Sequence, residues 1–233
     1  MSKPSFFQIA IDGPVAAGKG TVSRLVAERL NFLYVDTGAM YRVTAFLALQ
    51  HSVEYTDVQG LVSILKQTDI QMHNPTKEES DGRLTTVLLN NEDVSWKIRT
   101  EEVGNGASKV AQIKEVREIL VEKQQLIASS QNVVMEGRDI TYRVLPDAQL
   151  KIYLTGKDFV RANRRHLQLQ MRGNDVNFNE VFIDLKERDN LDMTREADPL
   201  KIVTEAWILD TSDLTIRQVV EMIVSKAEVM MKE

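Results

Sequence analysis

A glycine-rich stretch that ends in a lysine is the first part of the sequence whose residue types suggest chemistry. It reads Gly13-Pro14-Val15-Ala16-Ala17-Gly18-Lys19-Gly20-Thr21 and lies between an apolar run and a segment of helical periodicity. Small residues let backbone N–H groups converge on a polyphosphate, the following helix adds the positive end of its dipole, and the lysine adds a mobile charge. An ordinary tight turn is the alternative, which we disfavour because both the loop and its context match a phosphate-binding loop.

The end of this loop departs from the general pattern, which asks for serine or threonine directly after the lysine. Here Gly20 follows Lys19, and Thr21 comes one position later. We expect Thr21 to contact either Mg²⁺ or a phosphate. The apolar run before Glu136 could be a strand that ends in an acid orienting Mg²⁺ through water. An acid at a strand end is also often only a cap or an ion-pair partner.

A second group of reactive side chains follows the next apolar run, where Asp36-Thr37-Gly38-Ala39-Met40-Tyr41-Arg42 supplies a carboxylate, a hydroxyl, an aromatic ring and a guanidinium. Ligands of open α/β sheets collect at the carboxyl ends of the strands, so this segment is expected to bind one. Farther on, Arg188, Asp192 and Arg195 have the spacing i, i+4, i+7 and share one face of a helix. They could form a site or only a surface ion-pair ladder of little energetic worth.

A run dense in arginine follows the strand-like segment that ends near Thr155. Arg161, Arg164, Arg165 and Arg172 fall on one helical face. Guanidinium groups on one arc suit a triphosphate, because phosphoryl transfer depends mainly on positioning and charge neutralisation. A solvated basic face is the alternative, and we rank Arg164 and Arg165 above the outer two arginines.

With these motifs assembled, the sequence resembles the bacterial cytidylate kinases along nearly its whole length. The most distinctive element is the one that spans residues 36–42, and the resemblance continues in Gly137-Arg138-Asp139 and in Ala197-Asp198-Pro199-Leu200. The ending Gly-Lys-Gly-Thr at residues 18–21 resembles the variant of the phosphate loop in the adenylate-kinase branch.

The resemblance implies transfer of the γ-phosphoryl group of ATP, with Mg²⁺, to CMP or dCMP. It also implies roles for residues in five groups. The cytosine would be read by Thr37, Arg117 and Asp139, the ribose by Ser108, Arg188 and Asp192, and the acceptor phosphate by Arg42, Arg138 and Arg195, with Asp36 and Tyr41 beside them. Catalysis would fall to Lys19, Arg138, Arg164, Arg165 and Arg195, while Arg161 would join the loop in binding ATP.

The base assignment has a physical rationale of its own. A carboxylate accepts from the exocyclic amine of cytosine and an arginine donates to the ring acceptors, whereas uracil presents the opposite edge. A buried polar group that the wrong base leaves unmatched costs roughly 1–3 kcal/mol.

Several residues depart from the family pattern. Ile140-Thr141-Tyr142-Arg143 stands where relatives continue with an apolar residue, glycine and threonine, so the turn is expected to differ in shape. Glu136 stands where the family commonly has aspartate, and Leu191 and Met193 replace common arginines. We expect these changes to affect ATP affinity and turnover more than the type of reaction.

The elements that must position these residues read as an α/β fold. Apolar runs at 6–11, 32–35, 133–135, 150–154 and 206–209 predict a five-stranded parallel sheet, and helical segments lie between them. Two excursions interrupt the alternation: a β-rich NMP-binding insert at about 67–104 and a helical lid at about 157–172. The core would comprise about 1–66, 105–156 and 173–233, all in one P-loop kinase unit.

The composition limits the classes of partner that we expect the protein to bind. The net charge of −5 argues against nucleic-acid or anionic-membrane surfaces, and no apolar run is long enough to predict a membrane span. The chain has no cysteine and no signal-peptide pattern at its start, so we expect a cytoplasmic protein, with a monomer as the default. Two rivals remain: a P-loop kinase for another nucleotide or a small carboxylated alcohol, and a nucleotide-dependent switch, which would not need the cluster at 36–42.

Overall fold

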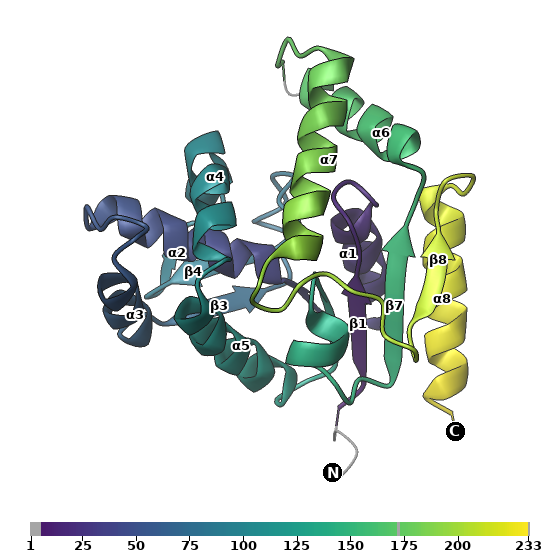
Figure 1. Ribbon diagram of the computed structural model, residues 1–233. Coiled ribbons are helices and arrows are strands. Elements are labelled where there is room, and N and C mark those ends of the chain that lie inside the picture. Colours follow the sequence, from purple (N-terminus) through teal and green to yellow (C-terminus); the bar gives the residue numbers. More distant parts are fainter. Residues whose placement is uncertain (1–5, 172, 233) are drawn as a thin grey trace.

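A five-stranded parallel sheet lies at the centre of the fold (Figure 1). The structure, a computed structural model, describes residues 6–171 and 173–232. The strand order is β2-β6-β1-β7-β8. The strands are β1 (Gln8–Asp12), β2 (Leu33–Asp36), β6 (Val133–Gly137), β7 (Leu150–Thr155) and β8 (Trp207–Asp210). The predicted five-stranded parallel sheet is confirmed, and its strands begin and end within about two residues of the apolar runs.

Helices cover the two faces of the sheet. Because side chains alternate along a strand, Ile9 and Ile11 join one hydrophobic core with α1 (Lys19–Leu30) and α8 (Ile216–Met230), while Ala10 joins the other. The second core includes α2 (Thr37–Gln50), α3 (Val58–Lys66), α4 (Glu101–Val110) and α5 (Lys114–Ala128). These two cores fix β1, and therefore the loop that follows it, from both sides.

A small antiparallel sheet lies beside the edge of the central one. It consists of β3 (Ile70–His73), β4 (Thr86–Leu89) and β5 (Glu92–Asp93), and a short 3₁₀ helix, Lys97–Arg99, follows it. Asn74 attaches it to the edge strand: its Oδ1 accepts from the Tyr34 N–H at 2.9 Å, and its Nδ2 donates to the Phe32 carbonyl at 2.8 Å. The expected β-rich excursion is therefore present. The Asn74 side chain satisfies backbone N–H and C=O groups at the edge of the central sheet that no neighbouring strand pairs.

Two helices project above the carboxyl ends of the strands, α6 (Asp158–Met171) and α7 (Phe178–Thr194) (Figure 1). They pack against each other through Phe178 of α7, whose ring contacts those of Phe159 and His166 of α6. The first of them occupies the segment expected to form a helical lid, although Arg172 lies outside the described residues. Within the described part of the chain, no helix is both long enough and apolar enough to cross a membrane.

Candidate active site

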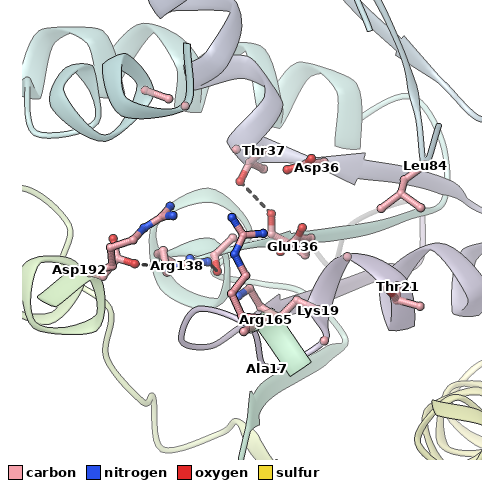
Figure 2. Close-up of a pocket in the computed structure, with 18 of the residues that line it drawn as sticks. Ala17, Lys19, Thr21, Asp36, Thr37, Leu84, Glu136, Arg138, Arg165 and Asp192 are labelled. Carbon is pink, nitrogen blue, oxygen red and sulfur yellow. Dashed lines mark hydrogen bonds and ion pairs between the residues drawn. The ribbon is translucent and has the colours of Figure 1, made fainter. Parts of the chain in front are cut away.

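A cavity of about 870 Å³ opens where the carboxyl ends of β1, β2 and β6 meet the projecting helices (Figure 2). It brings together residues that are far apart in the sequence and that the motifs singled out separately. Of the predicted site residues that the structure describes, all line it except Gly13, Pro14, Val15 and Arg161.

The phosphate loop connects β1 to α1 and is closely packed where it begins. A Cβ atom on Gly13 would lie 2.0 Å from the Leu154 carbonyl oxygen, so only glycine allows the loop to leave the sheet here. Gly18 has a φ of 93° and begins the helix. Its left-handed backbone is one that glycine adopts without steric cost, and it leaves the first N–H groups of α1 directed at the cavity.

Lys19 lies along this loop. Its Nζ donates to the carbonyl oxygens of Gly13 at 2.8 Å and Pro14 at 2.9 Å. Burial, together with the positive charge of Arg138, lowers the pKa of Lys19 to about 7. A polyphosphate in the cavity would counter both effects and stabilise the ammonium form.

Glu136, at the end of β6, faces the first turn of α1. The Tyr34 hydroxyl donates to its Oε1 at 3.4 Å. Burial, together with the nearby charge of Asp36, raises the pKa of Glu136 to about 7. From the sequence, Tyr34 was interpreted only as part of an apolar strand. Its position two residues before Asp36, a carboxylate of the candidate site, could have identified it.

The unusual Gly20 has close neighbours in the structure. A Cβ atom there would lie 3.3 Å from the Tyr34 hydroxyl oxygen, 3.5 Å from Glu136 Oε1 and 3.6 Å from Leu84 Cδ1. A serine side chain would extend farther into these atoms, which gives a physical reason for the missing hydroxyl at position 20. Leu84 also lines the cavity, so the excursion with the small sheet reaches the phosphate loop. Its apolar side chain gave no signal of that role.

The donor set near this loop suits Mg²⁺ held mainly by nucleotide phosphates and water. Thr21, which carries a hydroxyl group, lines the cavity, and Glu136 offers a partly buried carboxylate that accepts one long hydrogen bond from the Tyr34 hydroxyl. Such a combination of few protein oxygens with substrate phosphates is typical of Mg²⁺ in phosphotransferases. In the part of the chain that the structure describes, no group of three or more His, Asp or Glu side chains is placed to hold a metal by itself.

Behind the loop, Arg161 and Asp189 form a buried brace. Asp189 Oδ1 accepts from the Val15 N–H at 2.9 Å, and Arg161 Nη1 donates to the Val15 carbonyl at 2.6 Å. The two side chains pair with each other at 2.7 Å. The structure therefore places Arg161 behind the loop and not in the cavity where contact with ATP was expected. Asp189 had no role in the sequence interpretation.

Arg164 and Arg165, on α6, line the cavity above the loop. Arg164 donates through Nη1 and Nη2 to the hydroxyl and the carbonyl oxygen of Thr211, at 2.8 and 2.6 Å. Arg165 extends into the cavity (Figure 2) and donates from Nη1 to Gln168 Oε1 at 2.8 Å. Arg164 and Arg165, which the sequence analysis ranked above Arg161 and Arg172, thus both line the cavity.

The segment after β2 forms one wall of the cavity. Asp36 caps α2 by accepting from the Ala39 N–H at 3.2 Å, and it pairs with Arg99 at 3.0 Å. The Thr37 hydroxyl donates to the Glu136 carbonyl at 2.8 Å. Arg99 lines the cavity as well, a contact that sequence reasoning missed.

Arg117 lines the cavity and is buried, with its guanidinium oriented by three acceptors. Nε donates to Asp198 Oδ2 at 2.8 Å, Nη1 to the Ala111 carbonyl at 3.1 Å, and Nη2 to Asp139 Oδ2. Its Cζ lies 5.4 Å from the centroid of the Tyr41 ring. Arginine has five N–H groups, so two remain for a planar ligand.

The remaining arginines are concentrated around α7. Arg138 Nε donates to Asp192 Oδ2 at 2.6 Å, and Arg195 donates to the Asp198 carbonyl from Nε and Nη2, at 2.9 and 2.5 Å. Burial and the charges of neighbouring arginines lower the pKa values of three guanidinium groups, those of Arg42, Arg188 and Arg195. This crowding of positive charge in a partly closed cavity is the electrostatic signature of a site for anions.

The departure at residues 140–143 takes the form of a π-helical turn, Ile140–Val144. Buried Asp12, the last residue of β1, holds it: Oδ1 accepts from the Ile140 N–H at 2.9 Å, and Oδ2 accepts from the Thr141 N–H at 2.8 Å and hydroxyl at 2.6 Å. Burial raises the pKa of Asp12 to about 6. The strand that leads into the phosphate loop therefore also anchors the segment that carries Asp139.

A phosphate loop between the first strand and helix, an arginine-lined cavity and a projecting helix that contributes two arginines define a P-loop kinase. The family model described as "Cytidylate kinase" matches residues 9–229. The "Cytidylate kinase" of Caldicellulosiruptor bescii is 45% identical over 213 residues, 91% of this chain and 92% of that protein. The one of Bacillus subtilis is 43% identical over 220 residues, 94% of this chain and 96% of that protein. The chain belongs to the cytidylate kinase family.

A solved structure of an uncharacterized protein from Eubacterium ventriosum shares the fold. Its TM-score is 0.52 at 11% identity, and the match covers 95% of this chain and 98% of that one. At this level of identity the likeness concerns the fold alone.

Proposed function

We propose that this chain transfers the γ-phosphoryl group of ATP, bound with Mg²⁺, to the 5′-phosphate of CMP or dCMP, giving ADP and CDP or dCDP. The observation that carries the proposal is the buried ion pair of Arg117 and Asp139 in the wall of the cavity. The two side chains offer donors and acceptors to one planar ligand. A carboxylate that accepts from an exocyclic amine, beside an arginine that donates to ring acceptors, matches the edge of cytosine and mismatches that of uracil.

The donor side of the cavity would hold ATP. The loop amides and Lys19 bind its phosphates, and Thr21 and Glu136 would hold Mg²⁺, Glu136 through water. The bound ion would neutralise phosphate charge that otherwise repels the acceptor. Arg161 supports this side indirectly, by fixing Val15 from behind.

The acceptor side would hold the monophosphate in line with the γ-phosphate. Arg42, Arg138 and Arg195 would bind its phosphate, and Ser108, Arg188 and Asp192 would contact the ribose, with Asp36, Thr37 and Tyr41 forming the wall beside them. The acceptor is already an anion, so no side-chain base is required. Arg164 and Arg165 would neutralise the transferring group, and their helix would exclude water from it.

All of these side chains come from one chain, which supports a monomer that acts on free nucleotides. The proposal places the reaction in the cytoplasm, because the donor is ATP.

An acceptor panel tests the proposal. A coupled ADP-release assay should show that CMP and dCMP are phosphorylated with a kcat/KM at least tenfold above that of UMP, AMP and shikimate. A strong preference for AMP or shikimate would contradict the cytosine assignment.

The donor assignment is tested by Lys19→Met. Loss of the ammonium group should lower kcat/KM for ATP about a hundredfold or more, as removal of one electrostatic contact to a transferring group commonly does. Lys226→Met, which changes an exposed lysine of α8 that lies over the Trp207 ring, is the matched control. A Lys19→Met enzyme within about threefold of the parent would overturn the assignment.

A further inference from the structure

The loop after α7 contains a residue in a strained backbone conformation. Asp198 has a φ of 47°, in the left-handed region that is costly for a side chain with a Cβ atom. Neighbouring contacts hold it there: Arg195 donates twice to the Asp198 carbonyl, and the Leu200 N–H donates to the Asp192 carbonyl at 2.7 Å. Strain of this kind persists only where the surroundings impose it, and it is concentrated at functional sites.

The Asp198 side chain connects this loop to the base-reading end of the cavity. Its Oδ2 accepts from Arg117 Nε at 2.8 Å, and its Oδ1 lies 3.6 Å from Arg143 Nε. Asp139 holds Nη2 of the same Arg117. The two carboxylates therefore fix the plane of the guanidinium, and with it the direction of the N–H groups that remain for a ligand.

Tyr142 holds the loop from the side of the π-helical turn. Its hydroxyl donates to the Pro199 carbonyl at 2.6 Å, and Lys201 Nζ lies 3.9 Å from the centroid of its ring. The turn itself is anchored on Asp12 through Thr141. A continuous set of contacts thus runs from Asp12 through Tyr142 and the loop to Arg117.

Neither Tyr142 nor Asp198 is among the residues that line the cavity. Tyr142 lies in the segment where the sequence departs from the pattern of the family. The contact from its hydroxyl to Pro199 is therefore a feature of this chain that the shared motifs do not supply.

We propose that Tyr142 is a positioning residue for the acceptor base: by holding Pro199 it keeps Asp198 in place, and Asp198 orients the guanidinium of Arg117 towards the cytosine. The inference rests on the proposed function, because it takes the acceptor to be CMP or dCMP. Without the hydroxyl, Asp198 can relax from its left-handed conformation, and Arg117 Nε loses a fixed acceptor. Arg195 also contacts Asp198, but the phosphate loop, Arg164 and Arg165 are not part of this chain of contacts.

Tyr142→Phe tests the inference, since it removes only the hydroxyl. We expect KM for CMP to rise about fivefold, the effect of one lost hydrogen bond, and the ratio of kcat/KM for CMP to that for UMP to fall by a similar factor. KM for ATP and kcat with saturating CMP should stay within about twofold. Binding of CMP in the absence of ATP, measured by calorimetry, should weaken by the same factor as KM rises.

Tyr55→Phe is the matched control. The Tyr55 hydroxyl is buried and has no hydrogen-bond partner among the described residues, so its removal should leave KM for CMP and the base ratio unchanged. Asp198→Asn is the second variant: asparagine tolerates the left-handed conformation but loses the charge that faces Arg117, so it should reproduce the rise in KM and the fall in the ratio.

The outcomes separate this inference from the proposed function. A parent enzyme that ignores CMP would overturn both. A parent enzyme that prefers CMP, together with a Tyr142→Phe enzyme that keeps the same KM for CMP and the same base ratio, would overturn the inference alone. A fall in kcat without a rise in KM would also overturn it, because that pattern indicates a contact made only in the transition state.

Discussion

The charged residues of the cavity hold one another in place, so the effect of one substitution depends on the partner that it leaves behind. Asp139 shows this at the scale of a single residue. It pairs with Arg117 and lies 3.9 Å from Arg195, and burial raises its pKa. The positive charges on both sides favour the ionised form, which is the form that accepts from an amine.

Asp139→Asn should therefore lower the selectivity for CMP over UMP more than it lowers the rate of phosphoryl transfer. The amide still occupies the space, but it can donate to the uracil carbonyl where the carboxylate cannot. We expect the ratio of kcat/KM for CMP to that for UMP to fall about tenfold or more in the coupled assay. Asp147→Asn, at an exposed position, should leave the ratio unchanged. An unchanged ratio in Asp139→Asn would count against its base-reading role.

Asp12 gives the protein a defined dependence of stability on pH. Its pKa is raised to about 6, so between its ordinary value of 3.8 and about 6 the folded state binds more protons than the unfolded state. The stability that this carboxyl contributes is therefore greatest below that interval and is lost as the pH rises through it.

Thr141→Val should make this loss larger, because the Thr141 hydroxyl donates to the ionised carboxylate of Asp12. We expect the free energy of unfolding to fall by about 2 kcal/mol at pH 8 and by about 1 kcal/mol or less at pH 5, where the carboxyl is neutral. Urea unfolding at the two pH values measures the difference. Thr44→Val removes a buried hydroxyl bonded to the Met40 carbonyl, and its cost should not depend on pH. Equal costs for Thr141→Val at both pH values would contradict the assignment.

At the scale of the elements, the brace behind the phosphate loop couples three segments. Arg161 comes from α6, Asp189 from α7, and both satisfy the backbone of Val15 in the loop. A movement of the projecting helices would therefore be transmitted to the loop that binds the donor. Because the pair is buried, removal of either side chain would leave the charge of the other without a partner.

Arg161→Met should destabilise the fold by about 3–5 kcal/mol, because Asp189 keeps a buried charge without its partner. The double variant Arg161→Met, Asp189→Leu should recover much of that loss while KM for ATP stays raised, since Val15 has lost both of its side-chain partners. Urea unfolding and steady-state kinetics give the two readouts. Arg29→Met breaks an exposed pair with Glu221 and should cost at most about 1 kcal/mol. Recovery of KM along with stability in the double variant would contradict a role in shaping the loop.

The elements also show how far the sequence alone could lead. Buried strands leave uninterrupted apolar runs, and the phosphate loop has a local pattern, so both could be located before the structure was known. Helical periodicity placed Arg161 and Arg164 on one face of α6. It could not show that Arg161 binds the backbone of the phosphate loop while Arg164 lines the cavity. The contacts of Leu84 and Asp198 join segments far apart in the chain and carry no local pattern at all.

At the scale of the whole molecule, the cavity draws its walls from the central sheet, from the segments that flank the small sheet, through Leu84 and Arg99, and from the projecting helices. A bound nucleotide therefore links all three parts. The molecule carries a net charge of −5, yet lysine and arginine predominate in this one place, so the anion site is local.

CMP should accordingly raise the melting temperature of the whole chain. At about a hundredfold excess over its Kd, a ligand that binds only the folded state adds about 2.7 kcal/mol, which corresponds to roughly 5–10 °C for a chain of this size. UMP at the same concentration should give a smaller shift, and in Asp139→Asn the two shifts should converge. Scanning calorimetry measures all four values. Equal shifts for CMP and UMP with the parent protein would argue against a site that reads the base.

The position of β1 in the sheet has a consequence for how the protein is made. Its neighbours are β6 and β7, and the hydrogen bond from the Phe7 N–H to Asn132 Oδ1 spans 125 residues. At translation rates of about 5–20 residues per second, roughly 6–25 seconds separate the synthesis of these partners. The phosphate loop is thus synthesised well before the strands on either side of β1 and cannot take its final shape until β7 follows. During that interval the apolar strand β1 has neither of its partner strands, and a ligand of the phosphate loop cannot yet help to stabilise the growing chain.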